Sequence, residues 1–156
     1  MKVCLYPGSF DPITNGHVEI ALRARKIFDK VIICVANNTQ KKYSFTLKER
    51  IEMIKETFKD YDGFEVTYTE GLVVDKAKEV GATCLIRGLR AVTDYEYEFM
   101  VHSTNEFIDK NIETIFFMAS KEYSFLSSST IKELHLYGAD ISSLVPKSVI
   151  KYWNKK

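Results

Sequence analysis

Neither sign of charge is in excess in this chain of 156 residues, which carries 22 basic and 21 acidic side chains and a formal net charge of +1. No global field would therefore attract nucleic acid or an anionic membrane. Long apolar runs are also missing: none approaches the roughly 20 residues that span a bilayer, and the apolar stretch after Met1 is too short for a signal peptide. We expect a cytoplasmic protein with no nucleic-acid and no membrane partner.

Cysteine is scarce and follows no spacing pattern. Cys4, Cys34 and Cys84 are odd in number and widely separated, and each lies inside a short apolar run. Such residues behave as small buried hydrophobes of a reducing compartment, and not as a disulfide framework. No cluster of histidine, cysteine and acidic residues has the spacing of a zinc site, so no protein ligands to a metal are predicted.

Several catalytic signatures are absent, and each absence argues against a class of enzyme. The chain has no G-x-x-x-x-G-K-[ST] loop and no G-x-G-x-x-G fingerprint, as P-loop kinases and dinucleotide-dependent oxidoreductases have. It also has no G-x-S-x-G elbow, and no cysteine lies in a polar loop beside a histidine. Covalent acyl transfer is therefore not expected.

Apolar residues alternate between strand-like and helix-like runs, with no repeat, low-complexity tract or linker, which predicts one domain over residues 1–156. Five short runs are typical of strands, and four of them are apolar enough to be buried on both faces. The alternation predicts an α/β fold, a Rossmann-like, doubly wound parallel five-stranded sheet with helices on both faces. The predicted strands are Val3–Tyr6, Val31–Ala36, Phe64–Tyr68, Thr83–Ile86 and Thr114–Met118.

Capping residues delimit the predicted helices. Capping-box spacing marks helix starts at Thr46–Glu49 and Thr93–Glu96. Gly81 and Gly138 suit the position just beyond a helix end, and Pro146 can begin the last helix. The predicted helices are His17–Phe28, one from Thr46 to about Phe58, Val74–Val80, one from Thr93 to about Asp109, Ser128–Tyr137, and one from Pro146 to near Trp153.

The segment after the first predicted strand, Pro7 to His17, is the first candidate site. Gly8 and Gly16 lack a Cβ atom where a backbone needs to approach a ligand closely. His17 falls in the first turn of a helix, where free N–H groups and the positive end of the dipole favour a phosphate. Its imidazole can donate a hydrogen bond to a phosphoryl oxygen. A helix cap with an incidental histidine is the alternative, and the spacing alone favours phosphate binding only modestly.

Two further segments with anion-binding chemistry follow the fourth and fifth predicted strands. Arg87-Gly88-Leu89-Arg90 comes directly after a buried strand, where guanidiniums are costly unless they meet anions; an ordinary solvated turn is the alternative. Ser127-Ser128-Ser129-Thr130 begins a helix and offers hydroxyls beside its free N–H groups, although one serine would suffice as the N-cap.

Position along the chain strengthens these assignments. Lys41-Lys42 follows the second predicted strand and could reach a phosphate, although two loop lysines are usually only solvated. Glu98 could accept a hydrogen bond from a ribose or adenine, although taken alone it suits an exposed helical charge. His102 and His135 have no partner at a useful spacing and suit structural or surface positions. All four anion-suited segments follow strands, where open parallel sheets bind ligands, and this favours function over chance.

These motifs resemble those of a known family. Thr14-Asn15-Gly16-His17 is similar to the T/H-x-G-H signature of the nucleotidyltransferase superfamily, and Ser127–Thr130 to its serine-rich signature. With Pro7–Pro12, Arg87–Arg90 and Tyr123–Ser129, they resemble the phosphopantetheine adenylyltransferase family over nearly the whole chain. The resemblance implies transfer of the adenylyl group of ATP to 4′-phosphopantetheine, giving dephospho-CoA and pyrophosphate in coenzyme A biosynthesis. It also implies a Mg²⁺ requirement, a homohexamer and feedback inhibition by CoA.

The resemblance implies roles for individual residues as well. His17 matches the transition-state stabiliser, and Lys41 and Arg90 complete the set expected to act on the reacting phosphates. Ser9 stands where many relatives carry threonine, so the hydroxyl is kept and a methyl group is lost. The implied acceptor-binding residues are Ser9, Lys41, the backbone at Val73, and Arg87. The implied ATP-binding residues are Ser9, Phe10, His17, Gly88, Leu89, Arg90, Glu98, Tyr123, Ser124, Phe125, Leu126, Ser127, Ser128 and Ser129.

Such a reaction needs no general base, because a phosphate monoester is already anionic near neutral pH. The protein must hold two mutually repelling anions in line and neutralise charge as it builds, a task that suits Lys41, Arg87, Arg90 and His17. The nearest rival is a transferase of the same superfamily that acts on nicotinamide mononucleotide or uses CTP. A non-catalytic nucleotide sensor is a second rival. The core of a class I tRNA synthetase is a third, but 156 residues leave no tRNA-binding module.

Overall fold

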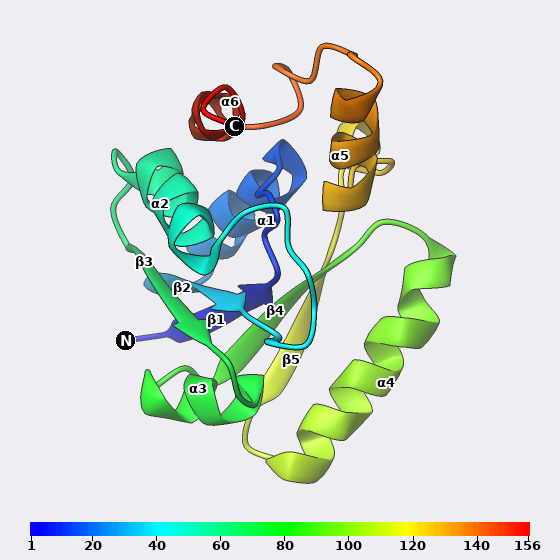
Figure 1. Cartoon of the computed structure of the whole chain (residues 1–156). Helices are drawn as coiled ribbons and strands as arrows, with labels where there is room; N and C mark the ends of the chain where they lie inside the picture. The colour runs from blue at the N-terminus through cyan, green and yellow to red at the C-terminus, as the bar shows by residue number, and fades with distance from the viewer.

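The computed structural model describes residues 1–156 and has helices on both faces of a five-stranded parallel sheet (Figure 1). Each predicted strand is present, and the predicted α/β class and doubly wound arrangement are confirmed. Each of the five strands extends by one to three residues beyond one end of its predicted range, because residues outside the apolar run continue the pairing there. The strands are β1 (Val3–Gly8), β2 (Lys30–Ala36), β3 (Phe64–Thr69), β4 (Cys84–Leu89) and β5 (Glu113–Met118).

The order of the strands across the sheet is β3-β2-β1-β4-β5. The chain therefore builds outward from β1 to β3, and then crosses back to place β4 on the other side of β1. Leu5 in β1 faces Ile32 of β2 on one side and Leu85 of β4 on the other. Beyond the C-terminal ends of β1 and β4, the connections lead to opposite sides, which leaves room for a ligand.

Two hydrophobic cores lie on the two faces of the sheet. The larger includes Ile20, Met53, Ile131 and Val149, and is covered by α1 (Asn15–Arg25), α2 (Leu47–Phe58), α5 (Ser128–Leu136) and α6 (Lys147–Trp153). The smaller lies on the opposite face of the sheet, which α3 (Val73–Glu79) and α4 (Val92–Ile108) cover in Figure 1. No helix is long and apolar enough to cross a membrane.

The burial of the strands differs from the prediction in one respect. Three strands, and not four, are largely buried on both faces: β1, β2 and β4. The other two are edge strands, because each pairs with one neighbour only. Tyr68 of β3 and Met118 of β5 are accordingly 48% and 61% exposed.

The helix starts differ from the sequence pattern at α4. The predicted capping box at Thr93–Glu96 is wrong: α4 begins at Val92, and its N-cap Ala91 makes no side-chain hydrogen bond. Asp94 is the reason, because its Oδ2 accepts from the backbone N–H of Arg90 at 2.9 Å and closes the turn earlier. The first helix also ends earlier than predicted. α1 stops at Arg25 and not at Phe28, because the chain turns at residues 26–27.

The three cysteines are free and buried, as predicted. Burial raises the pKa of Cys4 and Cys34 to about 12, and that of Cys84 to about 11. These thiols are therefore protonated at neutral pH and act as small apolar residues of the sheet.

Candidate active site

A cavity of about 310 Å³ opens between β1 and β4, where the strand order reverses. Its wall is formed by the end of β1, the first turns of α1, the end of β4, one face of α4, and the segment between β5 and α5. Three of the four segments predicted to bind anions meet there. The predicted site residues that line the cavity are His17, Arg87, Gly88, Arg90, Glu98, Tyr123, Leu126, Ser127 and Ser128.

The other predicted site residues do not line the cavity. Phe10 and Leu89 are buried in the protein interior, while the remainder lie on loops or helix starts beyond the same ends of the strands. Of the residues expected to bind the acceptor, only Arg87 faces the cavity. The roles of the others stay predictions. These residues are Ser9, Phe10, Lys41, Val73, Leu89, Ser124, Phe125 and Ser129.

Five cavity residues lie outside the predicted anion-binding motifs: Tyr6, Ile20, Asp94, Tyr97 and Ala119. Asp94 and Tyr97 share a helix face with Glu98, because residues three and four apart on a helix are neighbours. The spacing would have identified this pair had Glu98 first been placed in the site. Tyr6 and Ile20 have the sequence context of ordinary core residues, and nothing in the sequence distinguishes them from core residues outside the cavity.

The hydrogen bonds of His17 fix which ring nitrogen carries the proton. The backbone N–H of Thr14 donates to Nδ1 at 3.0 Å, and Thr14 Oγ1 lies 3.1 Å from the same nitrogen. A backbone N–H can only donate, so Nδ1 is the acceptor and the neutral ring carries its proton on Nε2. His17 therefore completes a capping box for α1 and keeps Nε2–H free for a ligand. Helix capping and phosphate donation were expected as alternatives for His17. The two are compatible, because Nδ1 serves the cap and Nε2–H is free.

The packing around His17 keeps the ring neutral. Its ring meets the edge of Phe10 at 5.0 Å and lies 6.4 Å from Tyr6, measured between centroids. Burial of the ring disfavours its charged form and is the main reason that the pKa of His17 falls from 6.5 to about 4; the positive charge of Arg90 lowers it further. At neutral pH the imidazole is therefore a neutral donor and neither an acid nor a charged group.

This predicts that His17 does not titrate near pH 6.5. The imidazole signals of His17, recorded by NMR and identified by their loss in a His17→Gln variant, should stay unchanged from pH 8 to 5.5 and should shift only near pH 4. Because the pKa of His17 is lowered in the folded protein, the ring takes up its second proton only at a more acidic pH than a free histidine does. A titration midpoint above pH 6 would contradict this account of the ring's surroundings.

Gly8 has an internal role beside its place in the cavity wall. Phe10 adopts a positive φ of 47°, which turns its ring back against Tyr6, with centroids 5.4 Å apart. A Cβ atom on Gly8 would lie 3.1 Å from the Phe10 ring. Any larger residue at this position would therefore force the Phe10 ring to move by a few tenths of an ångström, so glycine favours the packing of Phe10 as well as a close approach by a ligand.

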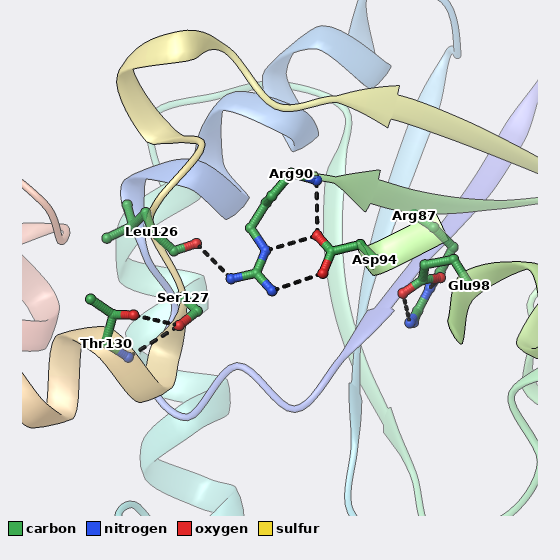
Figure 2. A network of polar contacts seen from close by, with 7 residues as sticks. All are labelled: Arg87, Arg90, Asp94, Glu98, Leu126, Ser127 and Thr130. Atoms are coloured by element: carbon green, nitrogen blue, oxygen red, sulfur yellow. Dashed lines mark hydrogen bonds and ion pairs between the residues drawn. The ribbon is translucent and has the colours of Figure 1, made fainter. Parts of the chain in front are cut away.

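Two arginines face two carboxylates from α4 (Figure 2). Arg87 lies in β4, and Arg90 is the residue directly after this strand. Glu98 accepts from Nε and Nη2 of Arg87, both at 2.7 Å. Asp94 accepts from Nε and Nη2 of Arg90 at 3.1 and 3.2 Å. Glu98 is 8% exposed, so it is not the exposed helical charge that its sequence context suggested.

The serine run divides its hydroxyls between three tasks. Ser127 caps α5, where its Oγ accepts from the backbone N–H of Thr130 at 3.1 Å. Ser128 Oγ donates to the carbonyl oxygen of Pro12 at 2.8 Å and ties α5 to the loop after β1. Ser129 is exposed and makes no side-chain hydrogen bond, so its hydroxyl is free at the start of the helix. One serine thus suffices for the cap, Ser128 has a separate structural role, and Ser129 keeps a free hydroxyl.

The loop that carries Lys41 is held at one end by Asp11. This carboxylate is 3% exposed, and it accepts from the backbone N–H groups of Ser44 at 2.8 Å and Phe45 at 2.9 Å. Lys132 on α5 completes the contact at 3.3 Å. Asp11 therefore joins the loop after β1, the loop after β2 and α5 at a single point.

Arg50, on α2, holds the other end of the same loop. It is 1% exposed, donates to the carbonyl oxygen of Ser9 at 3.0 Å and to Asn37 Oδ1, and its guanidinium lies 3.9 Å from the ring centroid of Tyr43. The Tyr43 hydroxyl in turn accepts from the backbone N–H of Asn38 at 2.8 Å. The sequence gives no sign of this arrangement, because Arg50 occupies an ordinary position in an amphipathic helix.

Comparisons with known proteins identify the group to which the chain belongs. Residues 5–134 match the family model described as cytidylyltransferase-like. A phosphopantetheine adenylyltransferase of Lachnoclostridium phytofermentans is 48% identical over 97% of this chain and 93% of its own length. One of Carboxydothermus hydrogenoformans is 49% identical over 96% and 92%, and one of Desulfosudis oleivorans is 45% identical over 100% and 93%. The chain therefore belongs to the cytidylyltransferase-like family and, within it, to the phosphopantetheine adenylyltransferases.

Proposed function

We propose that this chain transfers the adenylyl group of ATP to 4′-phosphopantetheine and releases dephospho-CoA and pyrophosphate. The observation that carries the proposal is the meeting of His17, Arg87 and Arg90 in one cavity where the strand order reverses. A neutral N–H donor and two guanidiniums suit a reaction in which both substrates carry negatively charged phosphate. Family membership and the names of the relatives support the choice of acceptor.

The reaction joins a phosphate oxygen of the acceptor to the α-phosphorus of ATP, and breaks the bond from that phosphorus to the oxygen that links it to the β-phosphorus; this oxygen leaves with pyrophosphate. His17 Nε2–H would donate to the non-bridging oxygens as their charge grows, and Arg90 would hold the departing phosphates. Arg87 and Lys41 would hold the phosphate of the acceptor. No proton is removed in the step, since the attacking monoester is already anionic.

We propose that ATP enters as its Mg²⁺ complex. Mg²⁺ is commonly held by substrate phosphates with at most one or two carboxylates, and it keeps several waters. The chain fits this mode, because no three of its histidine, cysteine and acidic residues are grouped to hold a metal ion by themselves. Bound to the phosphates, Mg²⁺ supplies positive charge against the leaving pyrophosphate.

The proposed function is tested by release of pyrophosphate from MgATP with each acceptor in turn. Turnover is expected with 4′-phosphopantetheine and not with nicotinamide mononucleotide, and CTP should not replace ATP. Preference for nicotinamide mononucleotide or CTP would assign the chain to another transferase activity. ATP binding without pyrophosphate release from any acceptor would favour a nucleotide sensor.

We also propose a homohexamer, and α4 supplies the structural support for assembly. Only Glu98 among the 17 residues of this helix is buried. Phe107 and Met100 are 89% and 71% exposed, and the helix lies along the outside of the molecule in Figure 1. Apolar side chains gathered on one exposed element are typical of an interface between subunits.

The expected result is that Phe107→Glu shifts the protein from a hexamer to smaller species in sedimentation velocity. The charge would be buried without a partner in the assembled state, while the lone subunit leaves the position in water. Leu136→Glu on α5, where the side chain is 77% exposed, provides a matched control that should leave the assembly unchanged. An unchanged hexamer in both variants would remove α4 from the interface.

CoA inhibition and a cytoplasmic location complete the proposal. CoA contains the pantetheine and adenylyl groups of the proposed product, so it would compete for the same cavity. Three free, buried cysteines are typical of proteins from a reducing compartment, which supports the cytoplasm.

A further inference from the structure

The contact between Arg90 and Asp94 uses one particular edge of the guanidinium. Oδ2 of Asp94 accepts from Nε, and Oδ1 accepts from Nη2, so the carboxylate lies against the side edge of the arginine (Figure 2). The same Oδ2 accepts from the backbone N–H of Arg90 at 2.9 Å. Three hydrogen bonds from one residue to one carboxylate fix both the backbone and the plane of the guanidinium.

A third segment completes the support of Arg90. Nη1 donates to the carbonyl oxygen of Leu126 at 3.4 Å, which reaches across to the segment between β5 and α5. Of the five N–H groups of an arginine, three are thus used within the protein. One N–H on Nη1 and one on Nη2 stay free, and the cavity is lined by this same residue.

The arrangement is repeated one turn further along α4. Glu98 holds Arg87 by Nε and Nη2 in the same side-on manner, and leaves both N–H groups of Nη1 unused. Asp94 and Glu98 are four residues apart on one helix, and Arg87 and Arg90 are three residues apart at the end of β4. One face of α4 therefore presents two carboxylates at the spacing of the two arginines that line the cavity.

We infer that Asp94 is a positioning residue that holds Arg90 by its side edge, so that the terminal N–H groups face the phosphates of ATP. The inference rests on the proposed function, because it gives Arg90 an anion to bind. In this role Asp94 acts through Arg90 and not on the substrate directly. Its side chain is 23% exposed, and its carboxylate accepts three hydrogen bonds from Arg90.

A purely electrostatic effect of Asp94 would have the opposite signature. A negative charge beside a phosphate site repels the ligand, so its removal alone should tighten ATP binding and leave kcat unchanged or higher. Loss of position should instead lower kcat, because a guanidinium free to rotate pays an entropy cost each time it meets the transition state. The two accounts are therefore separable in the same variant.

The experiment compares Asp94→Asn with Glu96→Gln, which makes the same charge change on an exposed position of α4 with no hydrogen bond to an arginine. Asp94→Asn should lower kcat by roughly 10- to 100-fold with an unchanged melting temperature. Glu96→Gln should keep the wild-type kcat. A kcat within threefold of wild type for Asp94→Asn, or tighter MgATP binding in calorimetry without a fall in kcat, would overturn the inference.

A double-mutant cycle shows whether Asp94 acts through Arg90. In an Arg90→Ala background, Asp94→Asn should cause no further loss of kcat, because the group that it positions is gone. A multiplicative loss in the double variant would show that Asp94 has a role of its own and would also overturn the inference. Wild-type turnover with 4′-phosphopantetheine is the common reference, and its absence would count against the proposed function and not against Asp94.

Discussion

Replacing His17 with alanine is expected to lower kcat by about 10²–10³, the usual cost of losing one donor aimed at a developing oxyanion. The proton of the neutral ring lies on Nε2, because Nδ1 accepts from the backbone of Thr14 at 3.0 Å. The variant keeps Arg87 and Arg90, so MgATP should still bind with an affinity close to that of wild type. Pyrophosphate release and calorimetry measure the two quantities separately.

The same variant should also be less stable, and this must be separated from the loss of turnover. Alanine at position 17 removes the acceptor for the Thr14 N–H and breaks the capping box of α1. Losing a helix cap costs about 1 kcal/mol in the free energy of unfolding. A fall in activity could therefore be blamed on the fold unless a second substitution restores the cap.

His17→Gln provides that control, because glutamine three residues after the N-cap is a usual partner in a capping box. Its side-chain oxygen can accept from Thr14, so the free energy of unfolding should return to within a few tenths of a kcal/mol of wild type. Turnover should stay at least about tenfold below wild type, since the fixed imidazole donor is missing. Wild-type turnover in either variant would contradict the role of His17, whatever its effect on stability.

The sequence predicts what depends on local pattern. Apolar runs located all five strands, and strand-then-motif order placed His17, Arg87, Arg90 and Ser127 at one edge of the sheet. These predictions succeed because parallel strands bring their C-terminal ends together whatever the details of packing. The exposure of β3 and β5 could not be predicted from apolar pattern, because the order of the strands, and not their composition, decides which of them lie at the edges of the sheet.

The contacts that orient the site residues lie outside the reach of sequence patterns. Asp94 looks like a helix-start acid and Arg50 like the polar face of α2, yet each is defined by partners from other elements. Asp94 even altered the start of α4, because its carboxylate bonds to Arg90 and replaces the capping box predicted at Thr93. The sequence thus identifies the groups that meet the ligand more readily than those that support them.

Asp11 is the supporting residue whose removal should have the largest effect on stability. Asp11→Ala is expected to lower the free energy of unfolding by about 2–4 kcal/mol, because the N–H groups of Ser44 and Phe45 lose a charged acceptor in a buried place. Chemical denaturation measures this change. Asp60→Ala, at an exposed aspartate without a side-chain hydrogen bond, should change the free energy of unfolding by less than about 0.5 kcal/mol.

The same substitution should weaken acceptor binding selectively. Asp11 and Arg50 hold the two ends of the loop that presents Lys41, while the cavity wall of Arg87, Arg90 and Ser127 is built by other elements. Asp11→Ala should therefore raise the KM for 4′-phosphopantetheine by about tenfold, the effect of about 1.4 kcal/mol, and change the KM for MgATP much less. Lys132→Met removes only the contact at 3.3 Å and should leave both KM values near wild type. Equal rises in both KM values would show that Asp11 supports the whole fold, and not this loop in particular.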